Sequence, residues 1–353
     1  NAVAAEPKHF VFRGAGDYDF NSKSVSVLYP YWFGALGNNS TDDYQEIQKT
    51  VDCAIRNKIG VVKLLSGYHL ISKGILIRNG VNTVTLTIEG NTDYDADYGT
   101  NIVSTDSTNF VIGIQGSRSC MVRNMYLRGK GSSYNPTPAQ IIQNTRAQWR
   151  AQWGRDDRYS PFSGIVIDPF KTTAPTGGGY PGFSDQYSNT HATSSAVIIE
   201  NVVIRYFPVG IMISPSGNNN NGAEVTIRSC TIDRCEYGFA GGSTQSRDVD
   251  LVNTNISTVA ACMDGVTFGG QAAPMPIVIG GQLSACKDIL RYSAARGDGK
   301  IVGTYSESVY RIGKWTSNSG APLNFNNCEI NFITSAETGL PDAASVLDAA
   351  GCT

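Results

Sequence analysis

The sequence is poor in charge. Of its 353 residues only 16% are Asp, Glu, Lys or Arg, below the share of about 25% that soluble domains usually carry, and the formal net charge is −2. It contains no run of about 18 apolar residues long enough to span a bilayer, and its first ten residues lack the basic and apolar regions of a signal peptide. We therefore expect neither nucleic-acid binding nor membrane insertion.

Spacings typical of metal sites are also missing. The eight Cys residues are scattered without a CxxC pair, and His9, His69 and His191 lie far apart in the chain. We expect no bound metal and no cofactor. An even number of Cys residues permits disulfides without requiring them.

What the chain does have is Gly, with 38 residues, many Asn, Ser and Thr residues, and a hydrophobic share of 41%. This composition favours a β-rich extracellular or particle-borne protein.

One amphipathic helix is predicted over 42–56, with Ser40 or Thr41 as its cap and Ile47, Val51 and Ala54 on one face. An α/β crossover would also contain such a helix, but no further helices alternate with the strands that follow.

Those strands repeat. Five segments starting at Val197, Val225, Val249, Ile277 and Ile301 align at successive spacings of 28, 24, 28 and 24 residues. The alignment places the following residues in three columns: Ile199, Ile227, Leu251 and Ile279; Ile204, Ile232 and Ile256; Gly210 and Gly238. Units of this length with short strands predict the coils of a parallel β-helix, stacked about 4.8 Å apart, with the 42–56 helix covering the N-terminal end.

Charges that played no part in the alignment support its register. Glu200 falls over Arg228, and Arg205 falls over Asp233, so opposite charges meet on adjacent coils twice. We assign these pairs to structure, because exposed pairs of this kind contribute at most about 1 kcal/mol each.

Two insertions interrupt one early coil, at about 130–161 and 171–194, and they leave the two ends of a predicted strand at 163–170. The first includes a predicted helix, "AQIIQNTRAQWRAQW", and both are rich in aromatic residues. Insertions in solenoids often form the binding side, so we expect them to wall a groove. We divide the chain into a lead-in with cap strands over 1–38, the β-helix over 39–335, and a C-terminal cap or tail over 336–353.

The segment "WFGALGNNSTDDYQEIQKTVDCA…GVVKLLSGYHL" resembles the N-terminal signature of the pectate-lyase-like superfamily, in which "FGA-G-G-TDD" precedes a helix and a "V-LP-G-Y-I" strand pair. Leu65-Ser66 stands where Pro is usual, and Asn38-Asn39 where Gly-Asp is usual. The resemblance implies an all-β, right-handed parallel β-helix like those of bacteriophage tailspikes and polysaccharide-active proteins. It also implies a polysaccharide partner, a homotrimer, and a virion-associated or secreted location.

The resemblance does not fix a reaction. We expect the protein to bind a bacterial surface or extracellular polysaccharide and to depolymerise it as a glycosidase. A non-catalytic receptor-binding fibre protein is the first alternative, and a polysaccharide lyase or epimerase is the second. Nothing in the sequence resembles the clustered "DD" and "GHG" elements of polygalacturonases, and the calcium-binding Asp constellation of classical pectate lyases is missing.

Glycoside hydrolysis needs two carboxyl groups. Asp168 is the first candidate, because alternation in "GIVIDPF" points it outward; an Asx-turn before Pro169 is the alternative. Asp156 and Asp157 form either an acid-base pair or a salt-bridged loop. Glu224 and Asp248 share a column, so they are either like charges on adjacent coils that raise the pKa of one acid, as an acid-base pair requires, or ordinary solvated surface residues. The predicted substrate-binding residues are Trp153, Arg155, Arg158, Tyr159, Tyr180, Tyr187, His191, Gln245 and Arg247.

Overall fold

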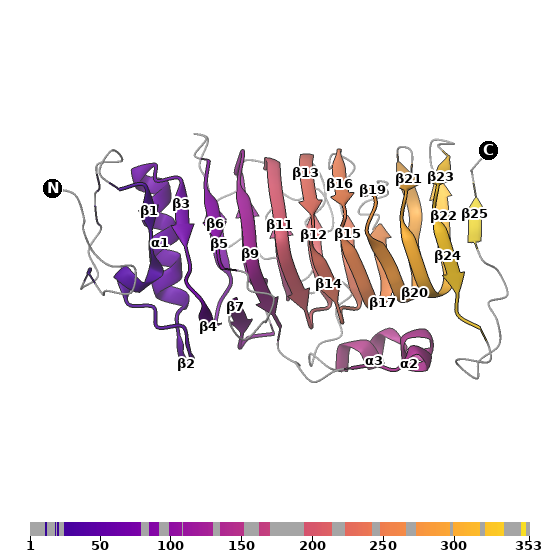
Figure 1. Cartoon of the computed structure of the whole chain (residues 1–353), viewed down its shortest axis with the longest axis horizontal. Coiled ribbons are helices and arrows are strands. Elements are labelled where there is room, and N and C mark those ends of the chain that lie inside the picture. Colours follow the sequence, from indigo (N-terminus) through magenta and orange to yellow (C-terminus); the bar gives the residue numbers. More distant parts are fainter. Residues whose placement is uncertain are drawn as a thin grey trace, which may run out of the picture.

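The chain forms a parallel β-helix, seen from the side in Figure 1. The structure is a computed structural model, and it describes residues 11–12, 18, 20, 25–78, 85–91, 99–107, 109–129, 135–151, 162–169, 194–213, 223–241, 248–265, 273–296, 299–317, 322–334 and 347–350. Every strand pairing in these residues is parallel, and strands of one coil pair with strands of the neighbouring coils. The strands form three faces, which we call sheets I, II and III.

Sheets I and II follow each other in every coil. Sheet I comprises β1 (Val27–Leu28), β3 (Val61–Lys63), β6 (Thr87–Glu89), the first parts of β9 (Met121–Arg128) and β11 (Ser195–Arg205), β13 (Ala223–Arg228), β16 (Val249–Val252), β19 (Ile277–Ile279), β21 (Gly299–Val302) and β23 (Leu323–Asn326). Sheet II comprises β2 (Asn38–Asp42), β4 (Gly67–Ile71), β7 (Thr100–Ser104), the second parts of β9 and β11, β14 (Thr231–Asp233), the first parts of β17 (Asn255–Gly265), β20 (Gln282–Arg296) and β22 (Tyr305–Ser317), and β24 (Glu329–Phe332).

Sheet III completes each coil. It comprises β5 (Ile75–Arg78), β8 (Ile112–Gln115), β10 (Ser163–Ile167), β12 (Val209–Ile213), β15 (Tyr237–Gly241), the second parts of β17, β20 and β22, and β25 (Leu347–Ala350); β18 (Ala273–Pro274) pairs with the end of β20. β25 lies within the segment that we expected to be a terminal cap or tail.

The predicted inner columns are confirmed, with one correction. Ile204, Ile232 and Ile256 are register partners on successive coils, and all three are fully buried. Ile199, Ile227 and Leu251 share another column. The fourth member of that column is Val278 and not Ile279, which pairs with Val252 and is 45% exposed. The prediction was wrong by one residue, because the alignment started this unit one residue late.

The glycine column makes room for the isoleucine column of the next coil. A Cβ atom on Gly210 would lie 2.4 Å from Cγ2 of Ile232 and 2.7 Å from the carbonyl oxygen of Gly238. A Cβ atom on Gly238 would meet Ile256 in the same way, at 2.3 Å. Real Cβ atoms do not approach other atoms so closely, so glycine is required here by packing against the adjacent coil.

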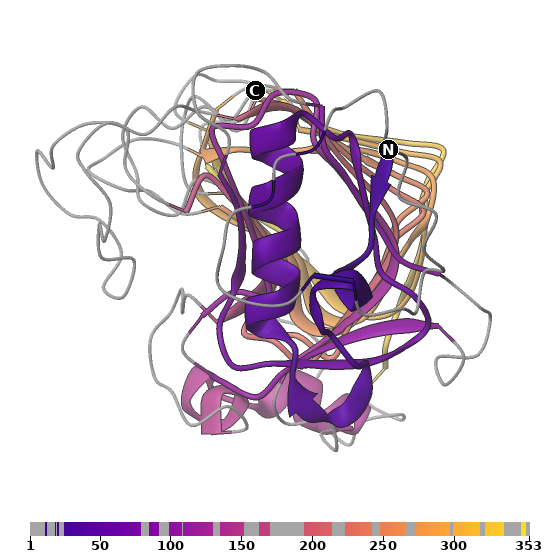
Figure 2. The same cartoon turned by 90° about the vertical axis from the view of Figure 1, so that its left-hand side faces the viewer.

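The N-terminal end of the solenoid is covered by the predicted helix. α1 (Tyr44–Asn57) crosses the open end of the coil, as Figure 2 shows, and buries Ile47, Val51 and Ala54 against the main core. It follows the short 3-10 helix η1 (Pro30–Phe33). Its N-cap is Asp43, whereas we expected Ser40 or Thr41, because those two residues belong to β2.

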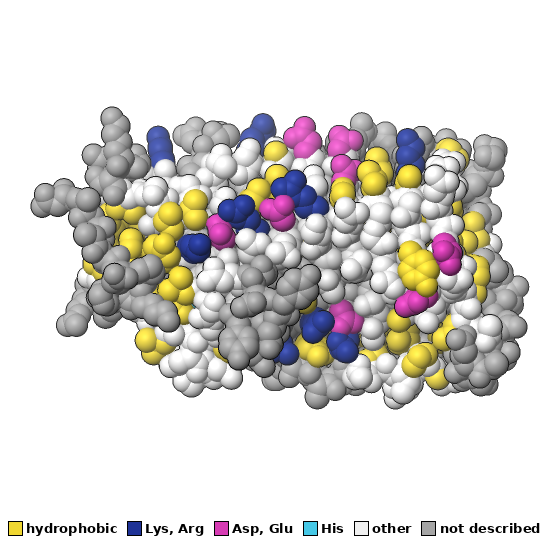
Figure 3. Space-filling view, in the orientation of Figure 1, with side chains coloured by type: hydrophobic (Ala, Val, Ile, Leu, Met, Phe, Trp, Pro, Cys, Tyr) yellow, Lys and Arg dark blue, Asp and Glu magenta, His cyan; other side chains and the backbone are white. Residues whose placement is uncertain are grey.

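A row of alternating charges runs along sheet I. Its members are register partners on five successive coils: Lys63, Glu89, Arg123, Glu200 and Arg228. Arg123 donates to Glu89 at 2.9 Å, and Arg228 donates to Glu200 at 2.8 Å. The predicted pair of Arg205 and Asp233 is also present, at 3.3 Å. Figure 3 shows this front face, where both signs of charge gather near the middle and uncharged side chains surround them.

The first insertion contains two short helices where we predicted a single one. α2 (Pro138–Gln143) is capped by Thr137, and α3 (Arg146–Ala151) follows after Thr145. The Thr145 hydroxyl accepts from the backbone N–H of Gln148, which is why a new helix starts at this point. α2 lies against β17 and β20, and both helices run beside the solenoid near the junction of sheets II and III (Figures 1 and 2).

Two findings bear on the sequence-based expectations about membranes and thiols. Among the described residues, no helix is long and apolar enough to cross a bilayer. Seven of the eight Cys residues fall in the described part of the chain, where all seven are free thiols and all but Cys328 are buried.

Candidate functional site

The outer surface of sheet III changes character along the solenoid. In its N-terminal half the outward side chains are apolar yet buried, and they form a cluster separate from the inner core: Phe110, Val166, Val209, Met212, Tyr237, Ala240 and Ala261. An apolar outer wall at near-zero exposure means that this face is covered rather than bare.

The C-terminal half of the same face is charged. The column that begins with Val166, Met212 and Ala240 continues as Asp264, Arg291 and Lys314. The neighbouring column runs from Tyr237 and Ala261 to Asp288 and Arg311. Carboxylates and cations of adjacent coils therefore face each other twice.

Asp288 is the centre of this group. Its carboxylate is fully buried and accepts hydrogen bonds from the guanidinium groups of Arg291 and Arg311. Nη2 of Arg311 lies 3.4 Å from Oδ2 of Asp288. The two guanidinium groups supply opposite charge and hydrogen-bond donors to a carboxylate that is shielded from water.

The cations in this group perturb each other. Burial lowers the pKa of Lys287, and the positive charge of Arg291 lowers it further, partly offset by the negative charge of Asp288. Burial also opposes the charge of Arg291, but the interactions with Asp288, Tyr237 and Asp264 together outweigh that effect and raise the pKa of Arg291. The guanidinium of Arg291 additionally lies 5.8 Å from the ring centroid of Tyr237.

One side of the charged half is bordered by the first insertion. The chain leaves sheet II after Gly129 and re-enters sheet III at Phe162, and between them α2 lies against β17 and β20. Trp149 of α3 is 1% exposed and belongs to the main core cluster. This Trp therefore anchors the insertion to the solenoid and does not offer its ring to a ligand.

Asp168 lies at the base of the second insertion but does not face open space as we expected. It is fully buried, and its carboxylate accepts from the hydroxyl of Ser194 at 2.6 Å and from the backbone N–H of Ser194 at 2.9 Å. The backbone N–H of Gly116 points to the same carboxylate at 3.4 Å. Asp168 thus ties together the two ends of the segment 169–193. The catalytic role of Asp168 stays a prediction.

Glu224 and Asp248 are neighbours, as predicted. Val225 pairs with Val249, so the two acids that precede them stand on adjacent coils at the start of sheet I, and both are exposed. Both adopt a left-handed backbone, at φ 56° and 57°. They lie at the corner where sheet III passes into sheet I, the corner at which the second insertion also leaves the coil.

The other predicted site residues lie outside the described residues: Trp153, Arg155, Asp156, Asp157, Arg158, Tyr159, Tyr180, Tyr187, His191, Gln245 and Arg247. For them the expectations from the sequence stand as predictions. Within the described part of the chain, no three His, Cys, Asp or Glu side chains gather in a way that would hold a metal ion.

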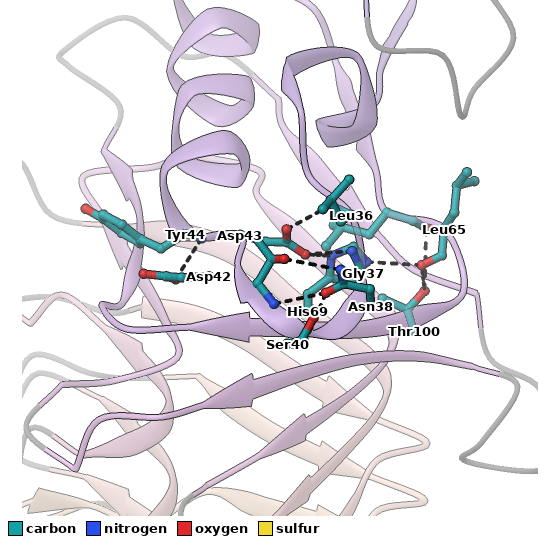
Figure 4. A network of polar contacts seen from close by, with 12 residues as sticks. Leu36, Gly37, Asn38, Ser40, Asp42, Asp43, Tyr44, Leu65, His69 and Thr100 are labelled. Atoms are coloured by element: carbon teal, nitrogen blue, oxygen red, sulfur yellow. Dashed lines mark hydrogen bonds and ion pairs between the residues drawn. The ribbon is translucent and has the colours of Figure 1, made fainter.

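A separate buried polar cluster lies under the N-terminal end of α1 (Figure 4). Asp43 accepts from Nδ1 of His69 at 2.8 Å and from the backbone N–H groups of Leu36 and Gly37, each at 2.8 Å. Burial alone would raise the pKa of Asp43, but these hydrogen bonds outweigh it and lower the pKa. Burial, together with the charge of Asp43, raises the pKa of nearby Tyr31 to about 12. This cluster fastens the cap through Asp43 of the "TDD" motif and through His69, which directly follows the "G-Y" of the signature.

Comparisons with known proteins agree with this architecture. No protein-family model and no curated protein sequence matches the chain. Among solved structures, the A-module of the Azotobacter vinelandii mannuronan C-5 epimerase AlgE6 has a TM-score of 0.50 and 15% identity over 88% of this chain and 77% of that chain. The fold is a right-handed parallel β-helix. The resemblance inferred from the sequence is thus confirmed at the level of fold.

For two further similar structures, the matched region is a smaller share of the other protein's chain. The catalytic domain of a GH87 α-1,3-glucanase has a TM-score of 0.50 and 10% identity over 84% of this chain and 45% of that chain. The enzymatically active domain of tailspike protein 2 of bacteriophage CBA120 has a TM-score of 0.49 and 16% identity, and the match covers 92% of this chain but only 46% of the tailspike chain. At such low identities the likeness concerns the fold alone.

Proposed function

We propose that this β-helix binds an acidic polysaccharide along the outer face of sheet III and depolymerises it. The observation that carries the proposal is the charged half of that face. Four cations, Lys287, Arg291, Arg311 and Lys314, accompany two carboxylates, Asp264 and Asp288, which leaves a positive excess beside the first insertion. The fold is shared with proteins named for action on polysaccharides, a mannuronan epimerase and a glucanase.

The exposure of these groups supports recognition of an anionic sugar. Both carboxylates are fully buried, whereas the Arg311 side chain is 37% exposed. A ligand running over the face would therefore meet guanidinium groups first. The planar fork of N–H donors on arginine matches the geometry of a carboxylate. Asp288 holds both arginines in place and lowers the entropy cost of binding.

Cleavage by a glycosidase requires an acid and a second carboxyl group. Asp264 and Asp288 are both fully buried, so we keep Asp156 and Asp157 of the first insertion as the proposed acid-base residues. We place the ligand where that insertion meets sheet III. A homotrimer on a virion or a secreted protein is the setting that we propose for this activity.

A lyase or epimerase is the second candidate, and Lys287 favours it. A lysine whose pKa is lowered by burial and by neighbouring arginines is a better general base near neutral pH. It would remove the proton next to a sugar carboxylate, while Arg291 and Arg311 neutralise that carboxylate. A protein that only binds the glycan would use the same arginines without either reaction.

The test uses the whole chain and a panel of acidic and neutral bacterial polysaccharides. We expect retention by acidic glycans in affinity electrophoresis that weakens with salt and falls about tenfold in Arg311→Ala. Arg228→Ala is the matched control, because it also removes an arginine paired with a carboxylate of the adjacent coil. Equal binding by both variants would overturn the proposed site.

The reaction is read from the products. New reducing ends without ultraviolet absorbance of an unsaturated uronate indicate a hydrolase, and absorbance that disappears in Lys287→Ala indicates a lyase. Inversion of a uronate without cleavage indicates an epimerase. If every glycan that binds stays chemically unchanged, the protein is a binder and the catalytic part of the proposal fails.

A further inference from the structure

An aromatic side chain lies open on the outer surface of the last coils. Tyr305 begins the sheet II part of β22 and is 39% exposed. Phe332 of β24 is 40% exposed on the same sheet. Figure 3 shows hydrophobic and acidic side chains together near the C-terminal end of this front face. An aromatic ring that is exposed on a rigid strand is available for contact with a ligand.

The neighbours of Tyr305 are hydrogen-bonding groups fixed by the coil register. Gln282 precedes it in the same column, and Glu329 follows it. Glu307 stands two residues along the same strand, and Asn331 stands two residues beyond Glu329. Adjacent coils are about 4.8 Å apart, so these side chains lie beside Tyr305 on the outer surface of the sheet.

The group is already ordered by its own hydrogen bonds. The hydroxyl of Tyr305 donates to Glu307 at 2.9 Å, and Nε2 of Gln282 donates to the other oxygen of Glu307 at 3.3 Å. Nδ2 of Asn331 donates to Glu329 at 3.1 Å. Each carboxylate oxygen has a second lone pair, so both acids can accept further hydrogen bonds from a ligand. A ring and acceptors held in position reduce the entropy cost of binding.

The chemistry of this group selects the ligand. An exposed ring packs well on the C–H face of a sugar, and carboxylate and amide groups bind the hydroxyls at its edge. The two nearest charges, Glu307 and Glu329, are negative, so a sugar that carries a carboxylate would be repelled. We propose that Tyr305, Gln282, Glu307, Glu329 and Asn331 form a second glycan-binding site, selective for a neutral, hydroxyl-rich sugar unit.

This site differs in place and in charge from the face proposed for the reaction. It lies on sheet II, and the cation-rich face lies on sheet III. Its existence does not depend on the proposed depolymerisation. A polysaccharide whose repeating unit contains both acidic and neutral sugars would engage both faces of the molecule.

The test is affinity electrophoresis of the whole chain in gels containing dextran, galactomannan or hydroxyethylcellulose as neutral probes, and alginate as an acidic probe. We expect at least one neutral probe to retard the protein. Tyr305→Ala should lower that affinity about tenfold, and Tyr305→Phe, which keeps the ring, should lower it less. Tyr126→Ala is the matched control, because Tyr126 occupies the same column of sheet II on an early coil.

Glu307→Gln is a second variant that keeps the shape of the side chain and removes its charge. We expect it to weaken neutral-glycan binding and not to weaken binding of alginate. The proposal is overturned if no neutral probe retards the wild-type protein, or if Tyr305→Ala binds as the wild type does. Arg311→Ala should leave neutral-glycan binding intact, which separates failure of this site from failure of the sheet III proposal.

Discussion

Arg311 and Asp288 are register partners on adjacent coils of sheet III, and the buried carboxylate of Asp288 receives both this guanidinium and that of Arg291. Arg228 and Glu200 form a comparable pair on sheet I, but there both side chains are partly exposed, at 43% and 27%. Comparing the two pairs therefore shows how burial changes the contribution of such an ion pair to stability.

Arg311→Ala should therefore cost more stability than Arg228→Ala. Removing Arg311 leaves a buried charge with one partner fewer, which we expect to lower the free energy of unfolding by about 1–3 kcal/mol. Removing Arg228 breaks an exposed pair worth at most about 1 kcal/mol. Urea unfolding of the two variants measures the difference. Equal losses of unfolding free energy in the two variants would show that the buried carboxylate of Asp288 does not need Arg311 as a partner.

Acid should loosen the N-terminal cap through Asp43. Its pKa is lowered in the folded state, so ionised Asp43 stabilises the fold above its unfolded pKa of about 3.9, and this contribution disappears as the pH falls through the lower folded pKa. Asp43→Asn should lose about 2–4 kcal/mol at neutral pH.

The pH dependence makes this prediction specific. The difference in unfolding free energy between the wild type and Asp43→Asn should shrink as the pH is lowered below about 4. Unfolding by urea at a series of pH values measures it. A difference that stays constant down to the acid limit would mean that the charge of Asp43 does not contribute.

Gly210→Ala tests the fit between coils. The added methyl group would collide with Ile232 and with the backbone of Gly238, so we expect a loss of about 1–3 kcal/mol. Gly60→Ala is the matched control, because a Cβ atom there would meet only the carbonyl oxygen of Thr85 at 3.6 Å. Thermal unfolding should show a lower Tm for Gly210→Ala and little change for Gly60→Ala.

The homotrimer expected from the family resemblance is tested directly in solution. One chain has a mass of 37.8 kDa, and sedimentation equilibrium should report three times that value. A monomer at every concentration would remove this part of the proposal, and it would leave the glycan-binding predictions unaffected.

Much of the fold could be predicted from the sequence, because repetition supplies many independent checks. The columns of Ile204 and Gly210 come from periodicity alone, and the pairing of Arg228 with Glu200 then confirms the register. Such agreement is possible because a solenoid turns distant positions into immediate neighbours.

The charged group on sheet III was missed for a traceable reason. With Ile279 in the place of Val278, the alignment sets Asp264 over Tyr292, whereas the structure sets it over Arg291. This slip of one residue hid the pair of Asp264 and Arg291, and a further slip of one residue in the next unit hid the pair of Asp288 and Arg311. The same signal had been recognised between Glu200 and Arg228. The burial of Asp168 was missed because its partner, Ser194, lies beyond a long insertion that a repeat pattern does not describe.

The row of Lys63, Glu89, Arg123, Glu200 and Arg228 restricts how this protein can grow in evolution. Duplicating one coil within the row would set two like charges against each other, whereas duplicating two coils together would preserve the alternation. Duplications that lengthen this part of the molecule are therefore favoured when they add an even number of coils.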